Sequence, residues 1–264
     1  MTEAIFIPEG TMFVPTKVAA SPWAERFQHG GPPAGLLTRA IERHAPDPEL
    51  QLARLTVDLF RPVPMAPLEV RAHTVREGKR IHVVEAGLFA DGVEVARAVG
   101  LLLRTSDHPN VTAVRLEPPP GPEGMSTGFG PSDLARRSEP MREGFHTLCE
   151  FRRIPPSTES AAAAAWVRIP LPLVAGEAIS PAVRVAATAD FINAIGGGGR
   201  GAWFPTINTD STVYLHRPAA GEWLCLLVER AIDPAGIGVS AAVIFDREGA
   251  IGRGAQAVLA NEMR

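Results

Sequence analysis

Cysteine is scarce in this 264-residue chain, which has only Cys149 and Cys225, far apart in the sequence. They form no CxxC pair and no Cys/His spacing suited to zinc, so neither a metal site nor a disulfide framework is indicated. Each is expected to be a small buried hydrophobe. We therefore expect no metal and no other cofactor.

Long apolar runs and runs of one charge are also missing. No stretch approaches the roughly 20 apolar residues that a membrane helix needs, and residues 1–4 lack the basic and apolar segments of a signal peptide. Lysine and arginine are scattered and the net charge is −3, which argues against a nucleic-acid partner. The expectation is a soluble, cytoplasmic protein with no membrane association.

An internal repeat is present. Residues 56–62 read TVDLFRP and residues 212–218 read TVYLHRP, at an offset of 156 (212 − 56). The turns at 91–92 and 248–249 recur at an offset of 157 (249 − 92). Near-equal offsets predict that the same strands and turns occur twice in the same order.

Each half is predicted to contain one helix followed by antiparallel strands. In the first half, Leu36, Leu37, Ala40 and Ile41 form one apolar face of a helix over residues 34–44. The other expected elements are strands near 55–59, 68–74, 81–90 and 93–104, then strands at 145–153 and 165–171, a helix over 180–195, and strands at 208–217, 222–232, 237–246 and 250–260.

One helix followed by an antiparallel meander indicates the hotdog arrangement. The predicted fold class is α+β, with two tandem hotdog domains, each an antiparallel sheet wrapped around a central helix. We expect an N-terminal hotdog domain over residues 1–105, a Pro/Gly-rich linker over 106–140 and a C-terminal hotdog domain over 141–264. Pairing the two sheets edge to edge would cover strand edges that otherwise invite aggregation.

Several short motifs together carry a resemblance to a known family. They are His29-Gly30-Gly31, Ala189-Asp190-Phe191, the run 208–213 leading into HRP at 216–218, GEWL at 221–224, and residues 249–256. As a set they resemble the double-hotdog acyl-CoA thioesterases, the group that includes acyl-CoA thioesterase II. The resemblance implies hydrolysis of an acyl-CoA substrate to free acid and CoA, a place in fatty acid metabolism, and a homo-oligomer.

The resemblance also implies three catalytic positions. In that family an Asp on the second-half helix, a Ser or Thr on the next strand and a Gln on the last strand hold the attacking water. These positions carry over to Asp190, Asn208 and Gln256. Asn208 departs from the hydroxyl residue of the family but can still donate and accept a hydrogen bond. Thr206 and Thr209 flank it and could serve if the register differs.

Those residue types suit thioester hydrolysis. Asp190 would act as the base, an effect of about 10²–10⁴-fold, while the amides of Asn208 and Gln256 would hold the water. Backbone N–H groups of Gly30 and Gly31 would stabilise the oxyanion, because glycine leaves room for close approach.

Three further residues are expected near the substrate. They are His29, Thr209 and Arg200, the last of which could meet a CoA phosphate. The first half has Val99 where the second half has Gln256, so one working site per chain is expected.

Other interpretations stay open. Asp190 and Gln256 could simply face solvent. A GxSxG match at 124–128 and a GxGxxG match at 196–201 lack the strand and helix context that either motif needs. A hotdog hydratase or dehydratase would need an Asp/His pair, and Asp190 has no histidine near it in sequence. A non-catalytic acyl-CoA or lipid-binding module would make Asn208 the mark of a decayed site.

Overall fold

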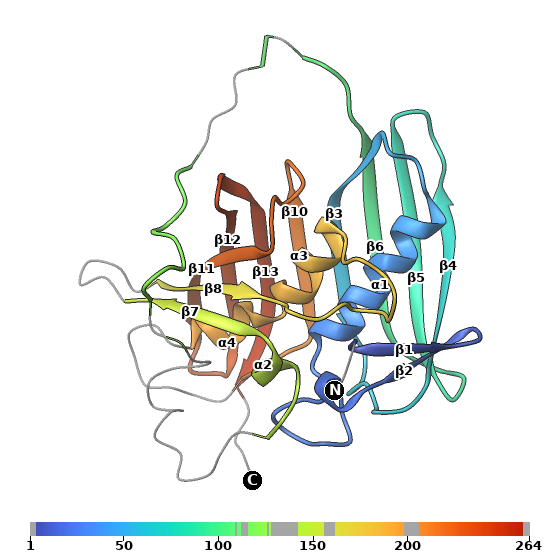
Figure 1. Ribbon diagram of the computed structural model, residues 1–264, viewed down its shortest axis with the longest axis horizontal. Helices are drawn as coiled ribbons and strands as arrows, with labels where there is room; N and C mark the ends of the chain where they lie inside the picture. Colours follow the sequence, from blue (N-terminus) through green and yellow to red (C-terminus); the bar gives the residue numbers. More distant parts are fainter. Residues whose placement is uncertain are drawn as a thin grey trace.

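The computed structural model describes residues 4–108, 110–111, 116–125, 127, 142–155, 162–197 and 206–260 (Figure 1). The elements up to residue 104 are β1 (Phe6–Glu9), β2 (Met12–Pro15), a 3-10 turn η1 (Lys17–Ala19), α1 (Gly31–His44), β3 (Leu50–Leu59), β4 (Leu68–Arg76), β5 (Ile81–Ala90) and β6 (Val93–Arg104). Those after residue 144 are α2 (Phe145–Leu148), β7 (Glu150–Ile154), β8 (Ala163–Arg168), α3 (Pro181–Ala189), α4 (Phe191–Gly196), β9 (Thr206–Asn208), β10 (Asp210–Leu215), β11 (Trp223–Ile232), β12 (Ile237–Asp246) and β13 (Gly249–Ala260).

The described strands form one sheet in which the two halves meet at β3 and β10. The order is β1-β2-β4-β5-β6-β3-β10-β13-β12-β11-β8-β7, with β9 beside β13. Thr56 lies opposite Thr212, and the Thr212 hydroxyl contacts that of Thr56 at 3.2 Å. These two residues occupy the same position in the sequence repeat. An approximate two-fold axis therefore passes between them.

The repeat is regular along the outer strands as well. The bounds of β12 and β13 follow those of β5 and β6 at an offset of 156 at both ends (237 − 81, 246 − 90, 249 − 93 and 260 − 104). The β5–β6 hairpin turns at Asp91 and Gly92, whose φ angles of 48° and 76° fit a two-residue turn of the I′ type. The hairpin predicted at this pair is confirmed.

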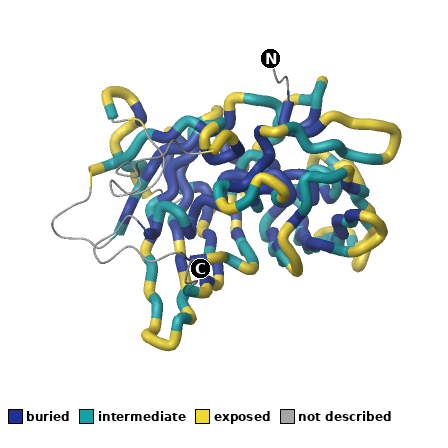
Figure 2. Tube along the Cα trace, turned by 90° about the horizontal axis from the view of Figure 1, so that it is seen from below, coloured by how far each residue is buried: buried dark blue, intermediate teal, exposed yellow. Residues whose placement is uncertain are grey.

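Both central helices lie on the same face of the sheet, as Figure 1 shows. α1 packs on β4, β5 and β6, α4 packs on β8, β11, β12 and β13, and α1 also contacts α3. One continuous apolar cluster draws residues from both halves, including Leu37, Ile41 and Ile192, each fully buried. Figure 2 shows this buried centre, with exposed residues gathered at the ends of the hairpins. The two halves share one core.

Several predicted elements are wrong in detail: the strand expected over 208–217 is divided into β9 and β10, and the strand expected over 165–171 ends at Arg168. The strand expected over 145–153 begins only at Glu150, because Phe145–Leu148 forms the helical turn α2. Thr147 Oγ1 accepts the N–H of Gly144 at 2.9 Å and so closes that turn. The helix expected over 180–195 is interrupted at Asp190 and continues as α4.

The described part of the expected linker packs against the second half. The Trp166 indole donates to the carbonyl of Pro120 at 2.8 Å, and the Ala250 N–H donates to that of Leu116 at 3.1 Å. Trp166 belongs with Cys225 and Phe245 to a small cluster separate from the main core. Ser126 and residues 128–141 lie outside the described residues, so the GxSxG match lacks its serine and its last glycine there.

Candidate functional site

Asp190 stands at the break between the two helices of the second half. Its φ and ψ of −60° and −22° are helical, and it both ends α3 and begins α4. An aspartate before a helix usually accepts a backbone N–H of the first turn. Asp190 makes no such bond. Its carboxylate is therefore turned toward other partners.

The first partner comes from the other half of the chain. His29 Nδ1 lies 2.6 Å from Asp190 Oδ2, and both side chains are less than 10% exposed, at 9% and 8%. A carboxylate oxygen can only accept, so Nδ1 carries the proton in this contact. The hydratase alternative needs an Asp/His pair, and the fold supplies the histidine that is not near Asp190 in the sequence.

The start of α1 is shaped around this carboxylate. The Gly31 N–H lies 3.4 Å from His29 Nδ1 and helps to lower the pKa of Asp190, and a helix N-terminus favours negative charge. A Cβ on Gly30 would lie 2.6 Å from Asp190 Oδ1, which is closer than atoms can approach. Gly30 is thus required for Asp190 to reach the helix, while the Gly31 N–H expected to face an oxyanion lies beside the His29–Asp190 pair.

Asn208 supplies a further hydrogen bond. Its Nδ2 donates to Asp190 Oδ1 at 2.8 Å. Of the two threonines kept as alternatives, Thr206 donates its hydroxyl to Asn193 Oδ1 at 2.7 Å and Thr209 is exposed. The asparagine, at the position aligned from the sequence, is the residue that contacts Asp190.

These donors determine the charge of the carboxylate. Burial raises the pKa of Asp190, but the charge and hydrogen bond of His29, together with hydrogen bonds from Asn208 and Gly31, outweigh it and leave the pKa below the ordinary value. Asp190 is therefore ionised at neutral pH.

Gln256 lies beside the same helix break. It is 1% exposed, its Oε1 accepts the N–H of Asn193 at 2.8 Å, and its Nε2 donates to the carbonyl of Ala189 at 3.1 Å. It thus contacts the backbone on both sides of Asp190. The first-half residue at its position is Gly100, not Val99 (256 − 156 = 100), because Val84 pairs with Gly100 as Ser240 pairs with Gln256.

An aromatic wall around His29 was missed by sequence reasoning. The rings of Phe191, Phe145 and His146 have centroids 4.8, 5.3 and 6.4 Å from that of His29. Burial, and next the charge of His29, lower the pKa of His146 to about 4, so it is neutral at physiological pH. Nothing in the sequence pattern places residues 145–146 beside residue 29.

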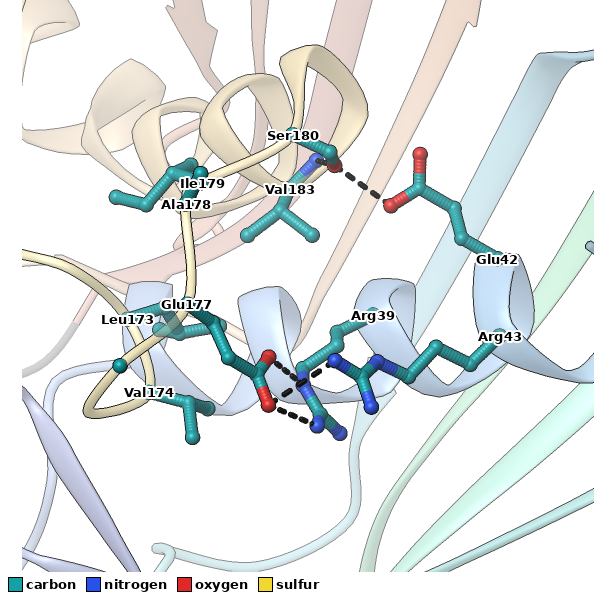
Figure 3. Close-up of a pocket in the computed structure, with 11 residues that line it drawn as sticks. Arg39, Glu42, Arg43, Leu173, Val174, Glu177, Ala178, Ile179, Ser180 and Val183 are labelled. Atoms are coloured by element: carbon teal, nitrogen blue, oxygen red, sulfur yellow. Dashed lines mark hydrogen bonds and ion pairs between the residues drawn. The ribbon is translucent and has the colours of Figure 1, made fainter. Parts of the chain in front are cut away.

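A pocket lies at the end of the antiparallel helix pair that is opposite to Asp190 (Figure 3). It has a volume of about 350 Å³. Ser180, which precedes α3, donates to Glu42 of α1 at 2.6 Å, while Glu177 binds Arg39 at 2.6 Å and Arg43 at 3.0 Å. Burial raises the pKa of Glu42, partly offset by Ser180. This pocket is the two-fold counterpart of the Asp190 site.

The amides of the Asp190 site are not repeated in this counterpart. The residues related to Asn208 and Gln256 by the offset of 156 are Leu52 (208 − 156) and Gly100. The expectation of one working site per chain follows from this asymmetry and stays a prediction.

The remaining expected features can be placed briefly. Arg200 and most of the 196–201 match lie outside the described residues. Cys149 and Cys225 are both buried, as predicted. Among described residues, no group of three or more His, Cys, Asp or Glu side chains is arranged to bind a metal, and no described helix has both the length and the apolar character needed to cross a membrane.

Solved structures with a similar fold show the fold class of this protein, and matches to known protein families show its family. The fold resembles a hotdog-fold protein of unknown function from Alicyclobacillus acidocaldarius (16% identity, 98% and 96% of the two chains covered, TM-score 0.73). It also resembles a putative thioesterase II from Thermobifida fusca (15%, 90% and 88%, 0.71) and the acyl-CoA thioesterase II TesB2 from Mycobacterium marinum (15%, 96% and 94%, 0.67). At these identities the likeness shows the fold, and the predicted α+β class with tandem hotdog domains is confirmed.

The family follows from the sequence. Residues 19–103 match the acyl-CoA thioesterase N-terminal domain and residues 116–260 match the acyl-CoA thioesterase C-terminal domain. The chain belongs to the acyl-CoA thioesterase family, as the resemblance predicted. A search of curated proteins found no match.

Proposed function

We propose that this protein hydrolyses an acyl-CoA thioester to a free acid and CoA. The observation that carries the proposal is the buried carboxylate of Asp190, on which His29 from one half and Asn208 from the other converge. Family membership supports the same reaction class.

The reaction requires an oriented water and a proton acceptor. The water oxygen bonds to the thioester carbonyl carbon while its proton passes to the His29–Asp190 pair. The tetrahedral intermediate then collapses, the carbon–sulfur bond breaks, and the departing sulfur receives that proton. General base catalysis of this kind contributes about 10²–10⁴-fold. We assign the proton to the pair and not to Asp190 alone, because His29 and Asn208 already donate to the carboxylate.

The proposal also covers the substrate contacts, the cellular location, the metabolic role and the oligomeric state. Asn208 retains a carbonyl oxygen that can hold the water, and we keep Thr209 and Arg200 as proposed substrate contacts. The cytoplasmic location, the role in fatty acid metabolism and the homo-oligomer stay predictions.

The test is thiol release from a panel of acyl-CoAs that differ in chain length, branching and aromaticity. Asp190→Asn and His29→Gln should each lower kcat by more than about tenfold with the fold retained. Glu42→Gln is the matched control, because it removes the carboxylate of the counterpart pocket and should leave turnover unchanged. An Asp190→Asn protein with the kcat of wild type would remove this carboxylate from the mechanism.

A second candidate, hydration of an enoyl-CoA or the reverse dehydration, is favoured by one observation. The His29–Asp190 contact is the acid/base pair that this alternative needed. Loss of the conjugated enoyl absorbance without thiol release would support it. Binding of acyl-CoA with neither reaction would favour the non-catalytic module.

A further inference from the structure

At the helix break, a side chain replaces one of the hydrogen bonds that would cross Asp190. In an unbroken α-helix the N–H of residue i donates to the carbonyl of residue i−4. Asn193 would therefore donate to Ala189 across Asp190. Instead, Asn193 N–H donates to Gln256 Oε1 at 2.8 Å, and Gln256 Nε2 donates to the Ala189 carbonyl at 3.1 Å. The side-chain amide of Gln256 is inserted into this single helical bond.

The chemistry of the two backbone groups orients this amide. A backbone N–H can only donate and a carbonyl oxygen can only accept, so the oxygen of Gln256 must face Asn193 and the nitrogen must face Ala189. Insertion of a side chain into the i to i−4 ladder is a known cause of sharp helix bends. The fully buried position of Gln256 on β13 leaves its amide held between the sheet and the helix.

The first half provides an internal comparison without the amide. There Gly100 occupies the equivalent strand position, and α1 runs unbroken for 14 residues. A Cβ on Gly100 would lie 2.7 Å from Ile41 Cγ2, so the helix packs directly onto the glycine. The same strand position therefore carries glycine below a continuous helix and glutamine below a broken one.

The break has a direct effect on Asp190. Because Gln256 accepts the Asn193 N–H, Asp190 is not needed to cap α4 and its carboxylate points to His29 and Asn208. Asn193 is also tied to Thr206 by two hydrogen bonds, of 2.7 and 3.2 Å, which fix the start of α4 beside β9.

We propose that Gln256 is a positioning residue that opens the second central helix at Asp190 and thereby directs this carboxylate to His29. Its effect on turnover rests on the proposed thioester hydrolysis, whereas its effect on the His29–Asp190 contact does not. Gln256 thus acts on the site through the helix, in addition to the role that the family resemblance implies for it.

The test compares Gln256→Met with Ser240→Ala in the substrate-free protein. Methionine has similar length but replaces neither hydrogen bond, so Asn193 and Ala189 regain their helical bond and Asp190 turns away. The readout is the NMR signal of the His29 Nδ1 proton, assigned by its loss in His29→Gln. Ser240→Ala is the matched control, because Ser240 is a fully buried polar residue paired with Gln256 on the adjacent strand.

The expected result is loss of the Nδ1 signal in Gln256→Met and its retention in Ser240→Ala. In acyl-CoA hydrolysis, Gln256→Met should lower kcat by about 10- to 100-fold, as misplacement of a catalytic group does, with little change in KM. A retained Nδ1 signal in Gln256→Met would overturn the proposal, whatever the change in turnover. If wild type hydrolyses no acyl-CoA, the proposed function fails while the NMR comparison still decides the role of Gln256.

Gln256→Glu covers the case in which the methionine variant does not fold. A protonated carboxyl group has both the donor and the acceptor that the amide supplies, whereas the ionised form lacks the donor. Relative to wild type at the same pH, the Nδ1 signal should be retained in acid and lost as the introduced carboxyl ionises. An equal signal at both pH values would contradict the proposed insertion.

Discussion

His146 shows how one buried side chain links the site to stability. Its ring is fully buried and stacks on His29 at 6.4 Å. Burial and then the charge of His29 lower its pKa from 6.5 to about 4. Between these pH values the unfolded chain binds a proton that the folded chain does not. Stability is therefore complete above pH 6.5 and falls as the pH decreases toward 4.

His146→Gln should reduce this sensitivity to acid. Glutamine stays neutral, so the loss of unfolding free energy between neutral and mildly acidic pH should shrink by about 3 kcal/mol. Urea unfolding at pH 7 and at about pH 4.5 measures the difference. His73→Gln, which changes a histidine with 64% exposure, is the control. Equal losses in wild type and His146→Gln would show that His146 does not carry the effect.

At the scale of elements, an ion pair explains the HRP motif that follows β10. Arg217 Nη2 binds Asp246 Oδ1 at 2.6 Å and the Gly249 carbonyl at 3.1 Å, which joins this corner to the β12–β13 turn. Asp246 is fully buried and also accepts the N–H groups of Ala220 and Glu248, each at 2.8 Å. The HRP motif therefore has a structural role, because it joins the end of β10 to the β12–β13 turn.

Arg217→Met should destabilise the protein by about 3–5 kcal/mol, because it leaves the buried Asp246 carboxylate without its cation. Burial raises the pKa of Asp246, but Arg217 and the two N–H donors lower it overall. The stabilisation by this ion pair is therefore present above the pKa of an unfolded aspartate, and it is lost as the pH falls through the lower pKa of the folded state. Urea unfolding at neutral pH is the measurement. Arg61→Met, at the equivalent exposed position of the first half (217 − 156 = 61), should change stability little. A similar loss of unfolding free energy in both variants would argue against this structural role of Arg217.

At the scale of the whole molecule, the two halves depend on each other. The main core draws from both, β3 pairs with β10, and the N–H of Phe6 in β1 donates to the carbonyl of Leu173 at 2.8 Å. Separation would expose this core and the long edge of β3, which favours aggregation. The site itself is divided, with His29 before the linker and Asp190 after it.

Fragments 1–108 and 109–264 should therefore be inactive and poorly folded when expressed separately, and should recover thiol release when coexpressed. Size-exclusion chromatography and thiol release are the measurements. A single fragment that is monomeric and unfolds cooperatively would show that the halves are independent domains.

Local pattern predicted much of the fold. The repeat offset of 156 and the alternation of apolar residues identified strands 81–90, 93–104 and 237–246 with the bounds observed, because a strand with one buried face shows its period directly in the sequence. Aligning the motifs also brought Asp190 and Asn208 to one site, and they are in contact. Both conclusions depend on short stretches of chain that carry their own signal.

Tertiary structure decided the rest. The contact of His29 with Asp190 depends on how two halves with a shared core pack, and no local period encodes such a contact. The helix break requires Gln256 to reach across from β13, and the sequence alone predicted a continuous helix over residues 180–195. The sequence by itself determined most of the strands, the two central helical segments and the family, whereas packing across the two-fold axis decided which side chains meet at Asp190.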